Sequence, residues 1–93
     1  IGFALKQNYP NPFNPVTSIE YTIGTGQVPR YENVTLRVYN SLGQQVATLV
    51  NEQKAPGSYE VKFDGSNLSS GVYLYRLQTT SGFNAIKKFV LLK

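Results

Sequence analysis

Hydrophobic and polar residues alternate along most of the chain. In the segment 19–23, the apolar residues Ile19, Tyr21 and Ile23 are separated by two polar ones. Successive side chains of a β-strand point to opposite faces, so this period of two predicts a strand with one face in a core. The same alternation predicts strands at 34–39, 59–63 and 73–78. No segment shows the apolar stripe of an amphipathic helix.

Two further segments are predicted to be strands although their patterns are less regular. The segment 45–50 alternates less cleanly, which indicates a strand with a bulge. The segment 85–92 is apolar except for Lys87 and Lys88, and we expect it to be the last strand.

Turn residues separate these strands at short intervals. Gly43 in Ser41-Leu42-Gly43 supplies the positive φ of a short hairpin loop, and Pro56-Gly57 matches the signature of a type II turn. Further turns are predicted at 64–67 and 81–82, and an exposed loop from Gly24 to Asn33. This organisation predicts an all-β fold, an antiparallel sandwich of about seven strands.

The segment Leu68–Tyr73 is predicted to be a corner at which the chain crosses from one sheet to the other. In sandwich domains, a tyrosine at such a corner commonly bonds back to nearby backbone through its hydroxyl group. Tyr73 is the candidate for this role, and Gly71 is the candidate for the unusual backbone conformation.

Prolines dominate the first part of the chain. Three of them lie between Asn8 and Pro15, and each removes a backbone donor, so this segment cannot be a central strand. We expect residues 1–17 to form an extended lead segment packed on the sandwich, with Tyr9 and Phe13 as apolar anchors. A peptide-recognition surface is the alternative, but covering the domain's own core leaves less apolar surface exposed.

Size and composition exclude most catalytic chemistry. The 93 residues predict a single domain, 1–93, with little room for a deep cavity. Cysteine and histidine are absent, which removes thiol nucleophiles, serine triads and the usual zinc sites. Of the five acidic residues, Glu20 and Glu60 are predicted to point outward, and the others lie at loops or strand ends. We therefore expect no enzyme, no cofactor and no metal site.

The net charge of +4 raises the question of anionic partners. Glu20 and Glu60 lie among the basic residues, we expect no stripe of arginine and lysine, and tryptophan is absent, so we expect no nucleic-acid partner. No apolar run is long enough for an integral membrane segment. The chain lacks methionine and begins without a signal peptide, so we expect a piece of a longer protein. If that protein is secreted, its signal peptide lies upstream.

Several motifs, in order, resemble those of the type A C-terminal sorting domain of the type IX secretion system. Gln7–Pro15 is similar to the opening signature of that family, Pro56-Gly57-Ser58-Tyr59 to its PxGxY motif, and Leu68–Tyr73 to its LxxGxY motif. The family pattern is also followed at 34–40, 42–43, 46–51 and, with the basic-apolar ending, 87–93. The similarity extends from about Leu5 to Lys93.

This resemblance implies an immunoglobulin-like sandwich at the C-terminus of a larger secreted protein of the Bacteroidetes–Chlorobi lineage. Such domains direct an upstream passenger from the periplasm through an outer-membrane translocon, and a surface sortase commonly removes them. The implied location is secreted or on the cell surface. The implied partners are the type IX translocon, the sortase and the passenger in the same chain.

The resemblance also implies a set of residues for translocon recognition. They are Pro56, Gly57, Tyr59, Gly71, Tyr73, Lys87, Lys88 and Lys93. A structural explanation competes, because backbone geometry can require the glycines, packing can require the tyrosines, and lysines on an edge strand discourage uncontrolled pairing. As a hypothesis, the last strand forms a sheet edge that docks on the machinery by strand addition.

Two other functions stay open from the sequence. One is an accessory carbohydrate-binding module with Tyr31, Tyr39 and Tyr75 as an aromatic platform, although the absence of tryptophan argues against it. The other is a structural spacer. A sorting domain must end its parent chain, so we expect Lys93 to be the last residue, and neither alternative has this requirement.

Overall fold

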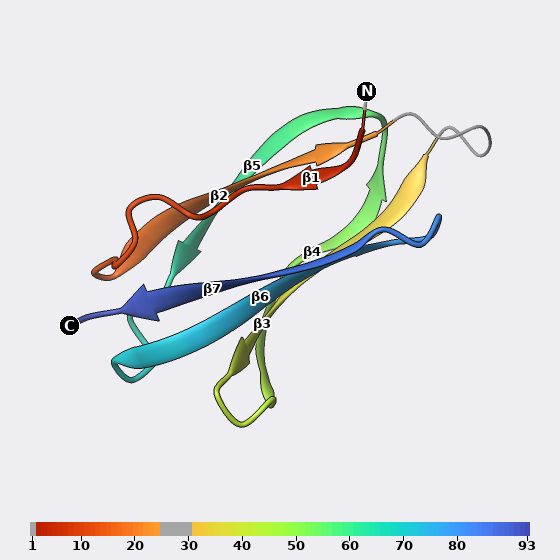
Figure 1. Ribbon diagram of the computed structural model, residues 1–93. Coiled ribbons are helices and arrows are strands. Elements are labelled where there is room, and N and C mark those ends of the chain that lie inside the picture. The colour runs from red at the N-terminus through yellow and green to blue at the C-terminus, as the bar shows by residue number, and fades with distance from the viewer. Residues whose placement is uncertain (1, 25–30) are drawn as a thin grey trace.

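The alternating segments of the sequence form strands that build two facing sheets. The computed structural model describes residues 2–24 and 31–93, and Figure 1 shows its two layers. Within these residues there are seven strands: β1 (Ala4–Leu5), β2 (Val16–Ile23), β3 (Glu32–Asn40), β4 (Gln45–Lys54), β5 (Gly57–Asp64), β6 (Gly71–Thr79) and β7 (Asn84–Leu91). The predicted all-β sandwich is confirmed. The described part contains no helix that is long and apolar enough to cross a membrane.

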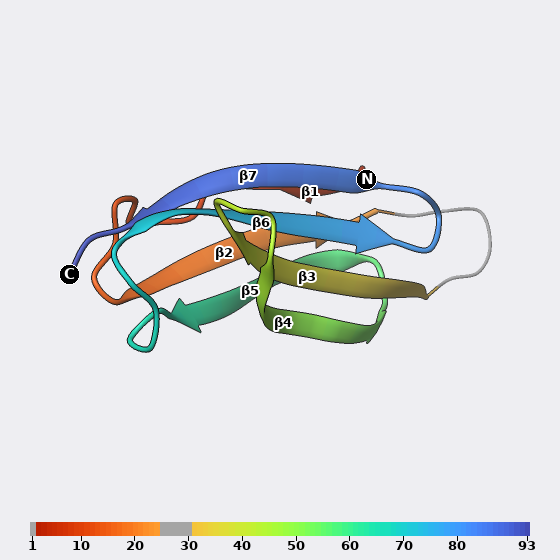
Figure 2. The same cartoon turned by 90° about the horizontal axis from the view of Figure 1, so that it is seen from below.

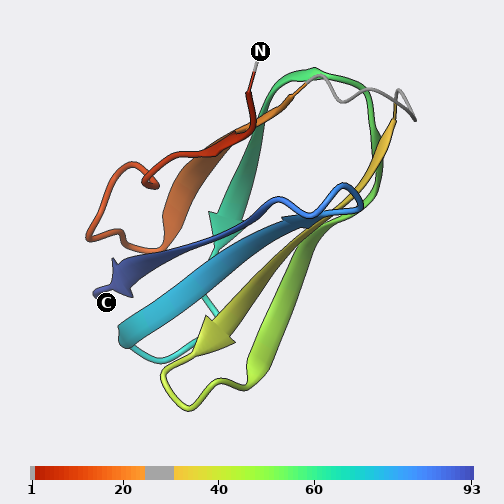
Figure 3. The same cartoon turned by 45° about the vertical axis from the view of Figure 1, so that its right-hand side comes forward.

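The strands divide into a three-stranded sheet of order β1-β2-β5 and a four-stranded sheet of order β4-β3-β6-β7. Every pairing is antiparallel. Hairpins join β3 to β4 and β6 to β7, whereas the chain changes sheet between β2 and β3, between β4 and β5, and between β5 and β6. Figure 3 shows the two sheets with the crossings from β4 to β5 and from β5 to β6 between them.

The core consists of the inward side chains of both sheets. The predicted alternation is visible in β3, where Val34, Leu36 and Val38 are fully buried and the residues between them are not. The other buried apolar residues are Leu5, Phe13, Ile19, Tyr21, Ile23, Val50, Phe63, Tyr73, Tyr75, Leu77, Phe89 and Leu91. Burial of this apolar surface is the main force that holds the two sheets together.

The irregular pattern of β4 has a structural cause. Its register against β3 shifts between Leu36 and Arg37 and again between Val38 and Tyr39, so the predicted bulge is confirmed. The strand also continues to Lys54, beyond the predicted end at residue 50, because β3 remains paired with it as far as Glu32.

Two predicted connections need correction. Pro56-Gly57 does not form a type II turn, because the φ of Gly57 is 153° and the strands it joins belong to different sheets. The loop predicted from Gly24 to Asn33 is shorter, because β3 already begins at Glu32. Residues 25–30 of that loop lie outside the described residues. The positive φ predicted for Gly43 is confirmed at 85°.

The proline-rich segment lies in an extended path beside β2 and β7. Tyr9 makes a bridge with Ser18 of β2, and Phe13 makes a parallel bridge with Leu91 of β7. Phe13 is an anchor as predicted, since its side chain is 2% exposed. The prediction for Tyr9 is wrong, because its ring is 80% exposed and the neighbouring Asn8 is buried in its place.

Hydrogen bonds explain why Asn8 takes that position. Its side-chain nitrogen donates to Thr17 Oγ1 at 2.9 Å and to the carbonyl oxygen of Pro10 at 3.1 Å. The hydroxyl of Thr17 also donates to the Pro10 carbonyl, at 2.8 Å. An asparagine can satisfy the backbone of a proline-rich turn in this way, which a tyrosine side chain at position 9 cannot.

Candidate functional site

The predicted tyrosine corner exists at the crossing from β5 to β6. The hydroxyl group of Tyr73 donates to the carbonyl oxygen of Ser69 at 2.7 Å, and the ring is buried. Gly71, two residues before the tyrosine, has a φ of 154°. The LxxGxY motif is thus explained by the geometry of a crossing between sheets.

A second corner of the same design lies at the crossing from β4 to β5. The hydroxyl group of Tyr59 donates to the carbonyl oxygen of Ala55, again at 2.7 Å and again four residues back. Gly57 precedes this tyrosine by two residues, and its φ of 153° matches that of Gly71. This corner was not predicted from the sequence, although the shared Gly-x-Tyr spacing of the two motifs was the signal for it.

The two corner glycines are required by backbone conformation and not by crowding. A φ near 153° is one that residues with a side chain rarely adopt. A Cβ atom added at Gly71 would meet nothing within 4 Å, and one added at Gly57 would meet the Tyr59 ring only at 3.9 Å. Any larger residue would therefore strain the chain even though space is available.

Tyr59 also takes part in a small cluster at its end of the sandwich. Its ring stacks on Tyr21 with centroids 5.5 Å apart, and Lys54 Nζ lies 4.8 Å from the ring centroid. Lys54 pairs with Glu52 at 2.6 Å, and this hydrogen bond raises the pKa of the Lys54 ammonium group. Burial raises the pKa of the Tyr21 hydroxyl.

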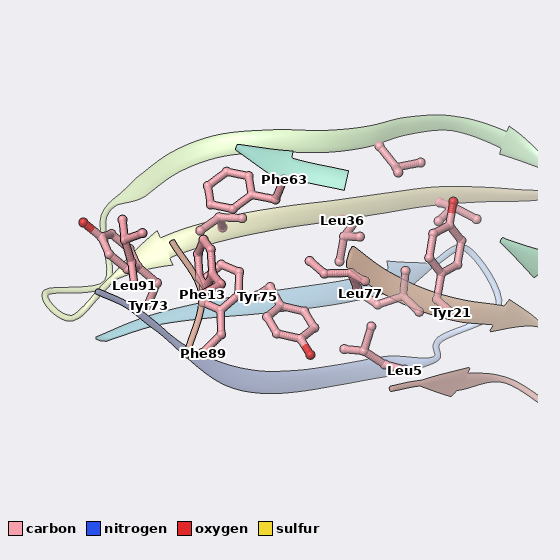
Figure 4. Close-up of a cluster of buried hydrophobic side chains, with 14 of the residues drawn as sticks. Leu5, Phe13, Tyr21, Leu36, Phe63, Tyr73, Tyr75, Leu77, Phe89 and Leu91 are labelled. Atoms are coloured by element: carbon pink, nitrogen blue, oxygen red, sulfur yellow. The ribbon is translucent and has the colours of Figure 1, made fainter. Parts of the chain in front are cut away.

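At the other end, Phe89 of the last strand is the centre of an aromatic cluster. Figure 4 shows its ring among those of Phe13, Phe63, Tyr73 and Tyr75. The centroid of Phe89 lies 4.9 Å from that of Phe13 and 5.1 Å from that of Tyr75. Phe89 and Phe13 belong to the last and first family motifs, so packing explains why both ends of the chain carry an aromatic residue.

The three predicted lysines have different surroundings. The register places Lys87 opposite Tyr75 on the inward side of β7, and Lys88 opposite Leu74 on the outward side. Lys88 is exposed and Lys87 is half-buried. Lys93 binds back to the corner before β6, since its backbone nitrogen donates to Ser70 Oγ at 2.9 Å and its Nζ donates to the carbonyl oxygen of Ser66.

The outer edge of β7 is not free for strand addition over its last part. The lead segment already occupies it, because Phe13 N donates to Val90 O and Leu92 N donates to Phe13 O, both at 2.9 Å. Asn11 Oδ1 accepts from Val90 N at 2.9 Å, and Gln7 Nε2 donates to Lys88 O at 2.7 Å. The hypothesis of docking at this edge is therefore wrong for residues 88–92, although β7 is an edge strand in its sheet.

The predicted recognition residues do not meet in one place. In Figure 1 the β4–β5 crossing, with Pro56, Gly57 and Tyr59, lies at one end of the sandwich. The β5–β6 crossing, with Gly71 and Tyr73, lies at the other end near the C-terminus. A partner that contacted both crossings would have to reach from one end of the strands to the other.

The aromatic platform suggested for a carbohydrate module does not form. Tyr75 is fully buried and points into the core, whereas Tyr39, which is opposite Leu74, is on the outward side of β3. Tyr31 is exposed but precedes β3. The three rings thus offer no common face.

Strand pairing creates a basic cluster that was not predicted from the sequence. Arg37 of β3 is directly opposite Arg76 of β6, and both lie on the outward side of the four-stranded sheet. Lys88 of β7 lies on the same side. The expectation that arginine and lysine form no stripe is wrong, because residues almost 40 positions apart become neighbours only when β3 pairs with β6.

Comparison with known families bears on these motifs directly. Residues 7–92 match the family described as the secretion system C-terminal sorting domain. The chain belongs to this family. A secretion system C-terminal sorting domain is a sorting signal for type IX secretion, so this one serves export through the outer membrane to the cell surface or the medium.

A solved structure supports the fold of this sorting domain. It is similar to part of PorZ from Porphyromonas gingivalis, described as an essential bacterial surface component of the type IX secretion system, with a TM-score of 0.60 and 20% identity. The match covers 99% of the chain and 12% of PorZ. CopC from Methylosinus trichosporium OB3b matches with a TM-score of 0.49 and 17% identity, over 97% and 91% of the two chains. No curated protein matches.

Proposed function

We propose that this sorting domain is recognised by the type IX translocon as a folded sandwich, and that its motifs act mainly by building the fold. It addresses an upstream passenger to the translocon, is a substrate of the sortase, and has no catalytic activity of its own. In this proposal the 93 residues form a single domain with residues 1–17 as its lead segment.

The observation that carries the proposal is the structural use of the motif residues. The hydroxyl groups of Tyr59 and Tyr73 donate hydrogen bonds to backbone carbonyl oxygens. Gly57 and Gly71 adopt the positive φ values that the two crossings require. Phe89 is fully buried, as is Leu91. Because these residues build the fold, the exposed surface that they hold in place is what a translocon can read.

The acidic residues support a role without catalysis. Glu20 and Glu60 point outward on neighbouring strands of an open sheet face. Each of the other three carboxylates is engaged within the domain: Glu32 accepts from Ser81 N, Glu52 pairs with Lys54, and Asp64 accepts from Ser66 N. The hydrogen bonds from Ser66 lower the pKa of Asp64. Catalysis by paired carboxylates needs two that face each other across a cleft.

An export assay tests the proposal. A fluorescent reporter is placed behind a periplasmic signal peptide and ahead of residues 1–93 in a host with the type IX machinery. The expected result is reporter on the cell surface or in the medium, and its retention in the periplasm when the translocon is disabled. Retention of the wild-type fusion in the complete host, with the domain folded, would overturn the proposal.

A further inference from the structure

The outward face of the four-stranded sheet carries charge of one sign. Figure 2 looks onto this face, on which β4, β3, β6 and β7 lie side by side. Arg37, Arg76 and Lys88 all lie on it. The acidic residues lie elsewhere: Glu20, Glu60 and Asp64 on the other sheet, and Glu32 and Glu52 on the inward side of β3 and β4.

Apolar side chains surround these cations. Tyr39, Leu74 and Ile86 line an open hollow of about 210 Å³, together with Arg76 and Gly43. Ile86 is 56% exposed, which is a large exposure for an isoleucine in the middle of a strand. A hollow with apolar walls and an arginine at its rim suits a partner that presents an apolar side chain next to an acidic one.

The two arginines oppose each other without a charge to offset them. Like charges directly opposite on neighbouring strands destabilise a sheet. Within the described residues, the ion pairs are Lys6–Glu20 and Lys54–Glu52, and neither includes a cation of this face. The Arg76 Nε atom donates to the neutral side chain of Asn84, whose Oδ1 lies at 2.9 Å.

The other sheet also has two like charges directly opposite each other, but there a lysine lies beside them. Glu20 and Glu60 are also directly opposite each other, but Lys6 Nζ lies 3.6 Å from Glu20 Oε1 and offsets one of the two charges. Lys62 is exposed on the same face. That face mixes both signs, whereas the face around Arg37 and Arg76 lacks an anion of its own.

We propose that the outward face of the four-stranded sheet, with Arg37, Arg76 and Lys88 around the hollow, is the surface on which an acidic segment of an export-machinery protein docks. The inference rests on the function proposed above and specifies the surface that the machinery reads. An acidic partner offsets the repulsion between the arginines, and one of its apolar side chains enters the hollow beside Leu74 and Ile86. A second copy docked by the same face would bring the two sets of cations together.

Matched variants on the two faces test this surface in the reporter assay. Arg76→Glu and Lys62→Glu change the net charge equally but lie on opposite faces. Ile86→Ser and Val16→Ser likewise remove exposed apolar side chains from opposite faces. We expect Arg76→Glu and Ile86→Ser to lower the exported fraction at least about tenfold, and both controls to change it less than about twofold.

Stability measurements keep this test interpretable. Arg76→Glu places opposite charges across β3 and β6, so its melting temperature should be no lower than that of the wild type. A variant that is at least as stable and yet poorly exported has lost recognition and not folding. Equal export of Arg76→Glu, Ile86→Ser and their controls, with the wild-type fusion exported normally, would overturn the inference and leave the proposed function intact. Failure of the wild-type fusion would instead count against the function.

A cross-linking experiment identifies the occupant. A photoreactive phenylalanine analogue replaces Ile86 in the exported fusion, and in a control fusion it replaces Lys62. The inference expects adducts from position 86 with a protein of the export machinery, within a segment that contains aspartate or glutamate. Adducts only with a second copy of the domain, with lipid or with nucleic acid, or only from position 62, would contradict it.

Discussion

The hydroxyl group of Tyr75 joins the core of the sandwich to the lead segment, because it accepts a hydrogen bond from the backbone nitrogen of Asn8 at 2.8 Å. The same hydroxyl donates to the carbonyl oxygen of Lys6 at 2.7 Å. These two bonds hold the start of the proline-rich segment over the fully buried Tyr75 ring, between β2 and β7.

Tyr75→Phe should therefore detach the lead segment without emptying the core. The substitution keeps the ring but leaves the buried Asn8 nitrogen without its acceptor, which costs about 1–3 kcal/mol. We expect the free energy of unfolding in urea to fall by that amount. Tyr9→Phe is the control. The Tyr9 side chain is exposed, so this substitution should leave the free energy of unfolding almost unchanged. Equal effects of the two substitutions would show that the Tyr75 hydroxyl does not hold the segment.

Alkaline pH should weaken the fold through the same hydroxyl. Burial raises the pKa of Tyr75 from 10.0 to about 12, although the hydrogen bond from Asn8 opposes part of this rise. The folded state thus favours the neutral phenol, and its contribution is complete below pH 10 and is lost as the pH approaches 12. Tyr21, whose pKa burial also raises, acts in the same direction. Urea unfolding across this range should show a steep loss of stability that is shallower in Tyr75→Phe.

Glu60→Gln should stabilise the domain. Glu60 is directly opposite Glu20, and the substitution removes the repulsion between two exposed carboxylates. We expect the free energy of unfolding to rise by about 0.5 kcal/mol at low ionic strength. The rise should be smaller in 1 M salt, because salt screens exposed charges. Chemical denaturation at the two salt concentrations measures this difference. A gain that is independent of salt would point to a cause other than charge.

The two tyrosine corners should contribute to stability in the same way. Tyr59→Phe and Tyr73→Phe each remove one hydroxyl bond to a backbone carbonyl, and each should cost about 1 kcal/mol. In the reporter assay, both variants should be exported normally at a temperature at which they are folded. Loss of export by a fully folded Tyr59→Phe or Tyr73→Phe would mean that the machinery reads the hydroxyl group itself.

Gly71→Ala should be more costly than its open surroundings suggest. The φ of 154° strains any residue with a Cβ atom. We therefore expect the free energy of unfolding to fall by about 1–3 kcal/mol. Gly2→Ala is the matched control, because an added Cβ there also meets nothing within 4 Å and no unusual φ is required. Similar melting temperatures for the two variants would show that Gly71 is not fixed by its backbone conformation.

The sequence predicts the inside of this domain better than its surface. Alternation identifies the buried residues of β2, β3 and β6 because the period of a strand is local. The placement of Tyr9 was wrong because the anchor beside it is an asparagine, held by hydrogen bonds to Pro10 and Thr17 that no hydrophobic pattern records. The pairing of Arg37 with Arg76 depends on which strands are neighbours, and a linear pattern does not contain that information.

In the family motifs too, local spacing predicts structure and contacts between distant parts of the chain are not predicted. Local spacing predicts the corner at Tyr73. The identical corner at Tyr59 was not predicted, because Pro56-Gly57 matched the signature of a tight turn. Local spacing also did not reveal that Phe13 reaches the last strand, since that contact joins the two ends of the chain. The corner glycines and tyrosines, which were candidates for recognition, thus have structural roles. The surface around Arg76 becomes visible only after folding.

The most direct test of the central claim is an export assay. It uses a variant whose core is disrupted but whose motifs are all intact. Ile19 is fully buried in β2 and lies outside all the family motifs, so Ile19→Asn should unfold the domain while the motifs stay intact. Glu20→Asn introduces the same residue at the neighbouring exposed position as a control. Recognition of a folded sandwich predicts that Ile19→Asn abolishes export of the reporter and Glu20→Asn does not. Normal export of an unfolded Ile19→Asn fusion would contradict the account, because the motifs would then be read as a linear signal.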